Sequence, residues 1–77
     1  MLLIRCSVCK NKLWKYNKIG NGEVLICHKD RITRIYEITN SEGRVSCTCG
    51  NEIGIDKGDF IKMIAKGFVY SGTKSSR

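Results

Sequence analysis

Cys6-Ser-Val-Cys9 and Cys47-Thr-Cys49-Gly50 are two short cysteine clusters that 37 residues separate. Two thiolates on one tight turn can point at the same ion, and two such turns complete a tetrahedron of soft sulfur ligands, which suits Zn²⁺. The glycine after the second cluster can supply the positive φ that such a turn often needs. Lys10 and Asn11 follow the first cluster, and asparagine tolerates the same conformation. The spacing predicts one structural zinc ion bound by Cys6, Cys9, Cys47 and Cys49.

Other uses of cysteine fit the sequence less well. The chain has five cysteines, and an odd number without a secretory signal argues against a framework of disulfides. A redox Cys-x-x-Cys would begin a helix in a βαβ unit, and no such pattern surrounds Cys6. Rubredoxin-like iron sites also use four cysteines, but they pair two Cys-x-x-Cys-Gly turns, whereas the second cluster here is Cys-x-Cys.

Cys27 and His28 are adjacent in a segment that reads as a strand, so their side chains point to opposite faces. Both cannot easily bind one ion, and a Cys27 nucleophile with His28 as its base is sterically awkward. We expect Cys27 to be a small core residue and His28 a surface residue. The alternative is that one of them replaces Cys47 or Cys49 as a metal ligand.

The rest of the sequence predicts one small, mainly β domain over residues 1–70 and a polar, mobile tail over 71–77. Gly20-Asn-Gly22 is a turn signal that favours a hairpin between the second and third predicted strands, and Asn40-Ser-Glu-Gly43 is another turn. Antiparallel hairpins clamped by the four cysteines are therefore the expected architecture. Strands are predicted over residues 1–5, 12–17, 23–28, 31–39, 44–46, 51–56 and 68–70.

The segment after Asp56 fits two structures. Asp59 could cap a short helix that ends at Gly67. Its apolar face would consist of Phe60, Ile61, Met63 and Ile64. The same residues could instead form a bent strand. We expect the short C-terminal helix.

The length of 77 residues makes the metal important for stability. A chain of this size buries only about 60% of its unfolded surface, so its apolar core alone is marginal. A structural zinc site can contribute roughly 10 kcal/mol of apparent binding free energy, against about 5 kcal/mol of net stability for a small domain. We expect metal removal to unfold the protein or to loosen its packing.

Several classes of protein are disfavoured. No apolar run approaches the ~18 residues of a membrane span, and the opening Met1–Ile4 meets Arg5 too early for a secretory segment. We therefore expect a cytoplasmic protein without membrane contact. One histidine, no clustered carboxylates and no phosphate-binding glycine pattern argue against an enzyme with a small-molecule substrate.

Basic residues are concentrated in the first half of the chain. The net charge is +7, and residues 1–34 carry eight basic side chains against Glu23 and Asp30. Zinc held by four thiolates would remove two of these positive charges and leave the chain basic, so we expect nucleic acid as the partner. The candidate nucleic-acid-binding residues are Lys10, Lys12, Trp14, Lys15, Tyr16, Lys18, Lys29, Arg31 and Arg34.

Two aromatic residues beside the first cysteine cluster favour RNA over DNA. In a regular strand over 12–16, Lys12, Trp14 and Tyr16 share one face, where two rings beside ammonium groups could stack unpaired bases and neutralise phosphates. Two alternatives stay open. Both rings could belong to the core, with the lysines as solvated cover, or the module could dock a protein through apolar residues such as Phe68 and Tyr70.

The second cysteine cluster, in Val45-Ser-Cys-Thr-Cys-Gly-Asn-Glu-Ile-Gly-Ile55, and the later Phe68-Val-Tyr-Ser-Gly72 resemble the zinc-binding β-tent group. That group includes the Yippee proteins, the thalidomide-binding domain of cereblon and the C-terminal domains of RNA sensors. The resemblance implies a β fold held by zinc and covers residues 1–72 in outline. The first cluster, in Ile4-Arg-Cys-Ser-Val-Cys-Lys-Asn-Lys-Leu-Trp-Lys15, also resembles the opening zinc turn of the Com-type phage regulators, which implies RNA binding.

Overall fold

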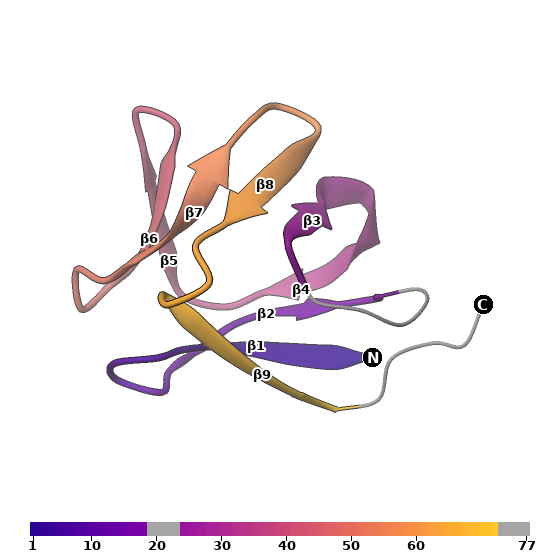
Figure 1. Cartoon of the computed structure of the whole chain (residues 1–77), viewed down its shortest axis with the longest axis horizontal. Coiled ribbons are helices and arrows are strands. Elements are labelled where there is room, and N and C mark those ends of the chain that lie inside the picture. The colour runs from indigo at the N-terminus through magenta and orange to yellow at the C-terminus, as the bar shows by residue number, and fades with distance from the viewer. Residues whose placement is uncertain (19–23, 73–77) are drawn as a thin grey trace.

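The computed structural model describes residues 1–18 and 24–72, and it consists mainly of two antiparallel β-sheets (Figure 1). One sheet has the strand order β4-β2-β1-β9 and the other the order β3-β8-β7-β6-β5. The small, mainly β architecture predicted from the sequence is therefore confirmed. The strands are β1 (Leu2–Cys6), β2 (Lys12–Tyr16), β3 (Ile26–His28), β4 (Ile32–Ile35), β5 (Ile38–Ser41), β6 (Arg44–Cys47), β7 (Glu52–Asp56), β8 (Phe60–Met63) and β9 (Phe68–Gly72).

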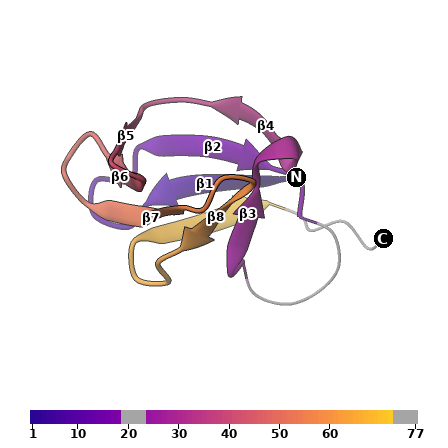
Figure 2. The same ribbon diagram turned by 90° about the horizontal axis from the view of Figure 1, so that it is seen from above.

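Two predicted strand relationships are wrong. The expected hairpin between the second and third strands does not form, because β2 pairs with β1 and β4 whereas β3 pairs with β8 in the other sheet. The predicted turn at residues 20–22 lies outside the described residues. The single strand expected over 31–39 is divided into β4 and β5, which follow one another along one edge of the molecule but belong to different sheets (Figure 2).

The expected C-terminal helix is also wrong, and the bent strand that was its alternative is present as β8. Ile61 and Met63 are buried while Lys62 is exposed, which is the two-residue period of a strand. β7 and β3 pair with the two edges of β8 and satisfy its backbone groups. The described residues contain one short 3₁₀ turn, η1 (Lys29–Arg31), and no helix with the length and hydropathy to cross a bilayer.

The last strand, β9, is longer than the sequence indicates. It continues to Gly72, so Ser71 and Gly72 of the expected tail pair with Leu3 and Leu2 of β1. Phe68 at the start of β9 is 8% exposed and belongs to the core, whereas Tyr70 is 38% exposed. Of the two residues expected to dock a protein partner, only Tyr70 is therefore available at the surface.

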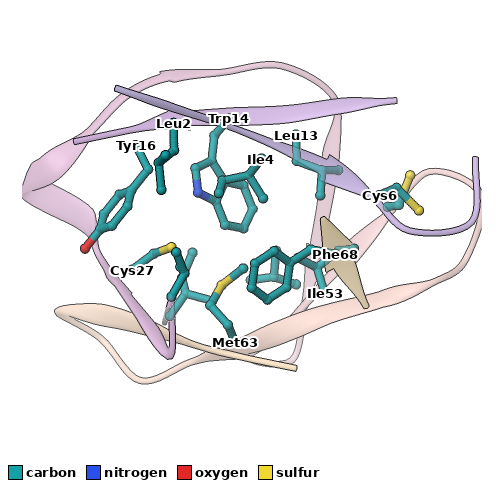
Figure 3. Packing of buried hydrophobic residues seen from close by; sticks show 14 residues of the cluster. Leu2, Ile4, Cys6, Leu13, Trp14, Tyr16, Cys27, Ile53, Met63 and Phe68 are labelled. Atoms are coloured by element: carbon teal, nitrogen blue, oxygen red, sulfur yellow. The ribbon is translucent and has the colours of Figure 1, made fainter. Parts of the chain in front are cut away.

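The hydrophobic core lies between the two sheets (Figure 3). Leu2 and Ile4 of β1 point from one sheet toward Cys27 and Met63 of the other, and Phe68 closes the space between them. Tyr16 lies at the end of the core, where its hydroxyl accepts a hydrogen bond of 3.0 Å from the backbone N–H of His28. This bond joins the two sheets on the side away from the cysteine clusters.

Trp14 and Tyr16 are core residues, with 0% and 1% of their surfaces exposed. A β-bulge separates Lys12 from the face of the two rings: Ile4 pairs with Trp14 and Arg5 with Lys12, so Leu13 is an extra residue in β2. Leu13 and Trp14 are both buried, and Lys12 and Lys15 are both exposed. The two rings are therefore unavailable for stacking on bases, as the core alternative predicted.

The burial of Trp14, the single tryptophan of the chain, has a spectroscopic consequence. We expect a blue-shifted emission and weak quenching by acrylamide in the metal-loaded protein, because the indole lies between two sheets. Nucleic acid should leave both properties unchanged, whereas chelation of the metal should shift the emission to the red. Quenching as efficient as that of free tryptophan would contradict this structure.

Candidate metal centre

Four cysteines from the two predicted clusters converge at one end of the molecule. Their Sγ atoms all lie within 4.8 Å of one another. Cys6 and Cys49 are 3.6 Å apart, and Cys9 and Cys47 are 3.3 Å apart, each pair joining one cluster to the other. A tetrahedron with metal–sulfur bonds of about 2.3 Å has sulfur–sulfur edges of about 3.8 Å. The four thiols therefore fit a single metal ion, as the spacing predicted.

Two strands from different sheets position these cysteines at their ends. Cys6 is the last residue of β1, and Cys47 is the last residue of β6. Each strand runs into a tight turn, and the two turns lie at the same end of the molecule (Figures 1 and 2). A metal ion bound there would join the end of an inner strand of the four-stranded sheet to the end of an inner strand of the five-stranded sheet.

Backbone hydrogen bonds close each turn. In the first turn (residues 6–11), the N–H of Cys6 donates to the carbonyl of Asn11 and the N–H of Lys10 donates to that of Cys6, at 3.0 and 3.1 Å. The second turn (residues 47–51) has the same two bonds, at 2.8 and 2.9 Å, but it is one residue shorter. The shorter turn accommodates Cys-x-Cys in place of Cys-x-x-Cys.

A residue with positive φ occurs in each turn. Gly50 has φ 97°, which confirms the role expected of it, and Lys10 has φ 65° in the first turn. The sequence pointed to Asn11 as the residue that tolerates this conformation, but the structure places the left-handed residue at Lys10. A non-glycine residue in this conformation is uncommon, and closure of the first turn is what requires it.

Asn51 connects the two cysteine turns, which we call the metal turns, to the segment between β8 and β9. Its Nδ2 donates to the carbonyl oxygen of Gly67 at 2.8 Å and lies 3.5 Å from Cys6 Sγ. The backbone N–H of Ser7 donates to the same Gly67 carbonyl at 3.1 Å, and Ser7 Oγ donates to Lys66 O at 2.8 Å. A Cβ atom at Gly67 would collide with the carbonyl oxygen of Glu52.

This supporting network was not anticipated from the sequence. Asn51 lies directly after the second cluster and could have been suspected from that position. Ser7 lies inside the first cluster, but its acceptor is 59 residues away. No local pattern around Gly67 indicates that it approaches the two cysteine turns, because the pairings of β9 with β1 and of β7 with β8 bring it there.

The protonation of the thiols shows the effect of crowding four of them together. Burial raises the pKa of Cys6, but hydrogen bonds from the N–H groups of Cys9 and Val8 and from the Asn51 amide outweigh it and lower the pKa to about 6. For Cys9, the Asn11 N–H lowers the pKa, but the neighbouring Cys47 thiol and burial prevail and raise it to about 12. A divalent cation would supply the positive charge that lets all four ionise, with release of protons.

Cys27 and His28 lie outside this cluster, so the alternative in which one of them replaces a ligand is wrong. Cys27 is completely buried in the core, at the end away from Cys6 (Figure 3). Burial raises the pKa of its thiol to about 11, which makes it a poor nucleophile at neutral pH. His28 is partly exposed, and its ring lies 6.1 Å from that of Phe60.

Three of the candidate nucleic-acid-binding residues, Lys12, Lys15 and Arg34, come together on the outer side of the four-stranded sheet. Lys15 of β2 pairs directly with Arg34 of β4, and Lys12 pairs with Arg5 of β1. Residues opposite one another in antiparallel strands share a face. We call Arg5, Lys12, Lys15 and Arg34 the basic face, and Arg5 is a member that the sequence analysis did not select.

Tyr36 takes the aromatic place on the basic face that was expected of Trp14 and Tyr16. The guanidinium carbon of Arg34 lies 5.3 Å from the centre of its ring, and Lys12 Nζ lies 5.6 Å from it. Both distances are in the range of cation–π interactions. A signal was available in the sequence, since Arg34 and Tyr36 are two residues apart and therefore share a face in extended chain.

The other candidate residues lie elsewhere. Lys29 Nζ forms an ion pair of 2.8 Å with Asp56, and this hydrogen bond is the main reason why the pKa of Asp56 falls to about 2. Arg31 is half-buried at the end of η1, and Lys18 is half-buried after β2. Lys10 is exposed on the first metal turn.

Charge is distributed unequally between the two sheets. The strands of the four-stranded sheet contain the four residues of the basic face and no carboxylate. Those of the five-stranded sheet contain Arg44 and Lys62 together with Glu52 and Asp56, and Arg44 pairs with Glu52 at 3.1 Å. The positive potential of the strands is therefore concentrated on one sheet.

Replacement of Cys47 by alanine should remove most of the bound metal in the presence of a competing chelator, because three thiols leave the shell open. Cys27→Ala is the matched control: it deletes a buried thiol of the core and should retain one metal ion per chain. Metal analysis of the purified variants measures both outcomes. Equal metal loss in the two variants would show that the four-cysteine assignment is wrong.

Asn51→Ala should weaken metal binding about 10- to 100-fold, as expected for loss of a group that orients a ligand. The variant loses the donor to Cys6 Sγ and the bond that holds Gly67. Asn11→Ala is the control, since Asn11 uses its backbone carbonyl in the equivalent position of the first turn. Competition with a chromogenic chelator gives the affinities, and unchanged affinity in Asn51→Ala would remove Asn51 from the site.

Comparison with known proteins adds no family to this description. No protein-family model matches the chain, and no curated protein or solved structure is similar to it. The resemblances to the β-tent group and to the Com-type regulators thus stay predictions drawn from the cysteine motifs. What the structure itself establishes is a small β domain in which four clustered cysteines can hold a metal ion.

Proposed function

We propose that the protein is a zinc-stabilised module that binds nucleic acid, RNA in preference to DNA, through the basic face. The single observation that carries the proposal is the meeting of Arg5, Lys12, Lys15 and Arg34 on one side of a sheet whose strands hold no carboxylate. Phosphate groups are the natural counter-charges for such a surface.

Zinc is the ion that this donor set favours. Four thiolates are soft ligands, and Zn²⁺ accepts them in a tetrahedron without a preference imposed by d electrons. Four protein ligands fill the tetrahedral shell, so the proposed role of the ion is structural, and the protein is proposed to bind rather than to catalyse. A cytoplasmic location suits this role, because that compartment keeps thiols reduced.

The arrangement of the basic face supports an anionic partner. Lys15 lies opposite Arg34, and Arg5 lies opposite Lys12. Like charges directly opposite one another destabilise a sheet, so these two pairs cost folding free energy in the absence of a ligand. A phosphate placed between the members of a pair would relieve this repulsion. Binding of a polyanion would therefore neutralise these cations and stabilise the fold.

The shape of the surface favours RNA with unpaired bases over duplex DNA. The basic face belongs to a sheet, and in the described residues no helix is available to enter a major groove. Sheets with a basic surface and an exposed ring bind single strands by neutralising phosphates and stacking bases. Tyr36 is the ring that can serve this purpose, because two cations of the face hold it at the surface.

The combined change Lys12→Glu and Lys15→Glu should weaken binding of single-stranded RNA at low salt by at least about tenfold and reduce its salt dependence, because two phosphate contacts become repulsive. Lys57→Glu with Lys62→Glu is the matched control. It alters the total charge equally but lies in and beside β8, on the other sheet. Fluorescence anisotropy over a salt series measures both variants.

Zinc content must be equal in the two variants for this comparison to be valid. Equal weakening in both would mean that only the total charge matters, and the basic face would lose its assigned role. Unaltered affinity at low salt in the Lys12 and Lys15 variant would also contradict the proposal.

A further inference from the structure

We propose that a groove beside Tyr36 accepts one unpaired base of the bound RNA, with preference for guanine. The inference rests on the proposed function and goes beyond it, because it assigns base recognition to a specific place at the margin of the basic face. The groove has a volume of about 500 Å³ and is lined by Asn11, Lys12, Arg34, Ile35, Tyr36 and Glu37. This volume is in the usual range for sites that bind small groups.

The position of the groove follows from the path of the chain. Tyr36 and Glu37 form the connection between β4 of one sheet and β5 of the other. The backbone N–H of Tyr36 donates to the carbonyl of Leu13 at 2.9 Å, which fixes this connection against the bulged strand β2. The groove is therefore held by backbone pairing rather than by a loose loop, and little ordering is needed on binding.

Tyr36 provides a surface on which a base can stack. Its ring is half-buried, and Arg34 and Lys12 lie over it at 5.3 and 5.6 Å. The contacts orient the ring before a ligand arrives, which lowers the entropy cost of stacking. A base that stacks on the ring takes the place of a cation over it, and the displaced cation can then bind a phosphate beside the base. One aromatic ring with two cations beside it thus matches one nucleotide unit.

Glu37 supplies the preference among bases. Its carboxylate is exposed and forms no ion pair or hydrogen bond with any residue in the described ranges, although it shares the groove with Lys12 and Arg34. A carboxylate repels phosphate, so its presence favours a group that donates hydrogen bonds. Guanine presents two neighbouring donors, N1–H and the N2 amino group, to the two oxygens of a carboxylate, whereas uracil presents one N–H between two carbonyls.

The test uses fluorescein-labelled eight-nucleotide RNAs and the zinc-loaded protein. One RNA is all uridine, a second carries one central guanosine, and a third carries inosine in its place, which lacks only the N2 amino group. We expect the guanosine RNA to bind about tenfold more tightly than the other two, the size expected for one paired hydrogen-bond contact to a base. Equal affinities for all three RNAs would overturn the inference.

Glu37→Gln should abolish the preference for guanosine while it leaves the affinity for the uridine RNA the same or slightly higher. Glu42→Gln is the matched control, because Glu42 is an exposed glutamate in the turn between β5 and β6, away from the groove. It should keep the preference. A preference that survives Glu37→Gln would overturn the assignment of Glu37.

Tyr36→Leu should weaken binding of all three single strands about tenfold, as expected for loss of a stacking ring. Unchanged zinc content and circular dichroism show whether this variant is folded, and Glu37→Gln tests the groove independently if it is not. Salt-dependent binding of every RNA without any base preference would refute the groove and leave the proposed function intact. No binding of any RNA at low salt would refute the proposed function itself.

Discussion

The contact between two cysteine turns from different sheets is the constraint on which the rest of the structure depends. It joins the end of β1 to the end of β6, and 37 residues separate the two cysteine clusters. Cross-linking such distant points removes much of the freedom of the unfolded chain. Asn51 extends the connection to Gly67 and so brings the β8–β9 segment to the same place. A domain with a core this small needs such a cross-link for its stability.

The opposite end of the molecule is held differently. There Tyr16 connects the sheets by its hydroxyl bond to the backbone of His28, and Lys29 binds Asp56 at the surface. These contacts are few, and the large apolar side chains between the two ends provide the remaining attraction. A metal ion held by the four cysteines would thus supply a rigid anchor at one end, while the core supplies burial between the two sheets.

The bulge in β2 decides which of its residues enter the core and which lie on the basic face. It directs Leu13 and Trp14 inward together and leaves Lys12 and Lys15 outward. The large rings consequently stabilise the fold, and the cations are free to act as a group. Tyr36, in the connection between the two sheets, is a half-buried ring beside two cations of the basic face. In the proposed function, stability and recognition would therefore use different aromatic residues.

The sequence by itself determined the four cysteines that cluster, the left-handed glycine after the second cluster, most of the strands and the core role of Cys27, because each depends on local spacing or on residue type. Only the tertiary structure decided which strands pair, that residues 60–63 join a sheet, and which face Trp14 and Tyr16 occupy. A one-residue bulge inverts the facing of a strand, and the partner of a strand is set by contacts distant in sequence. Asn51 and Tyr36 had local signals, one directly after the second cluster and the other two residues after Arg34, but Arg5 and Gly67 acquire their places only through those pairings.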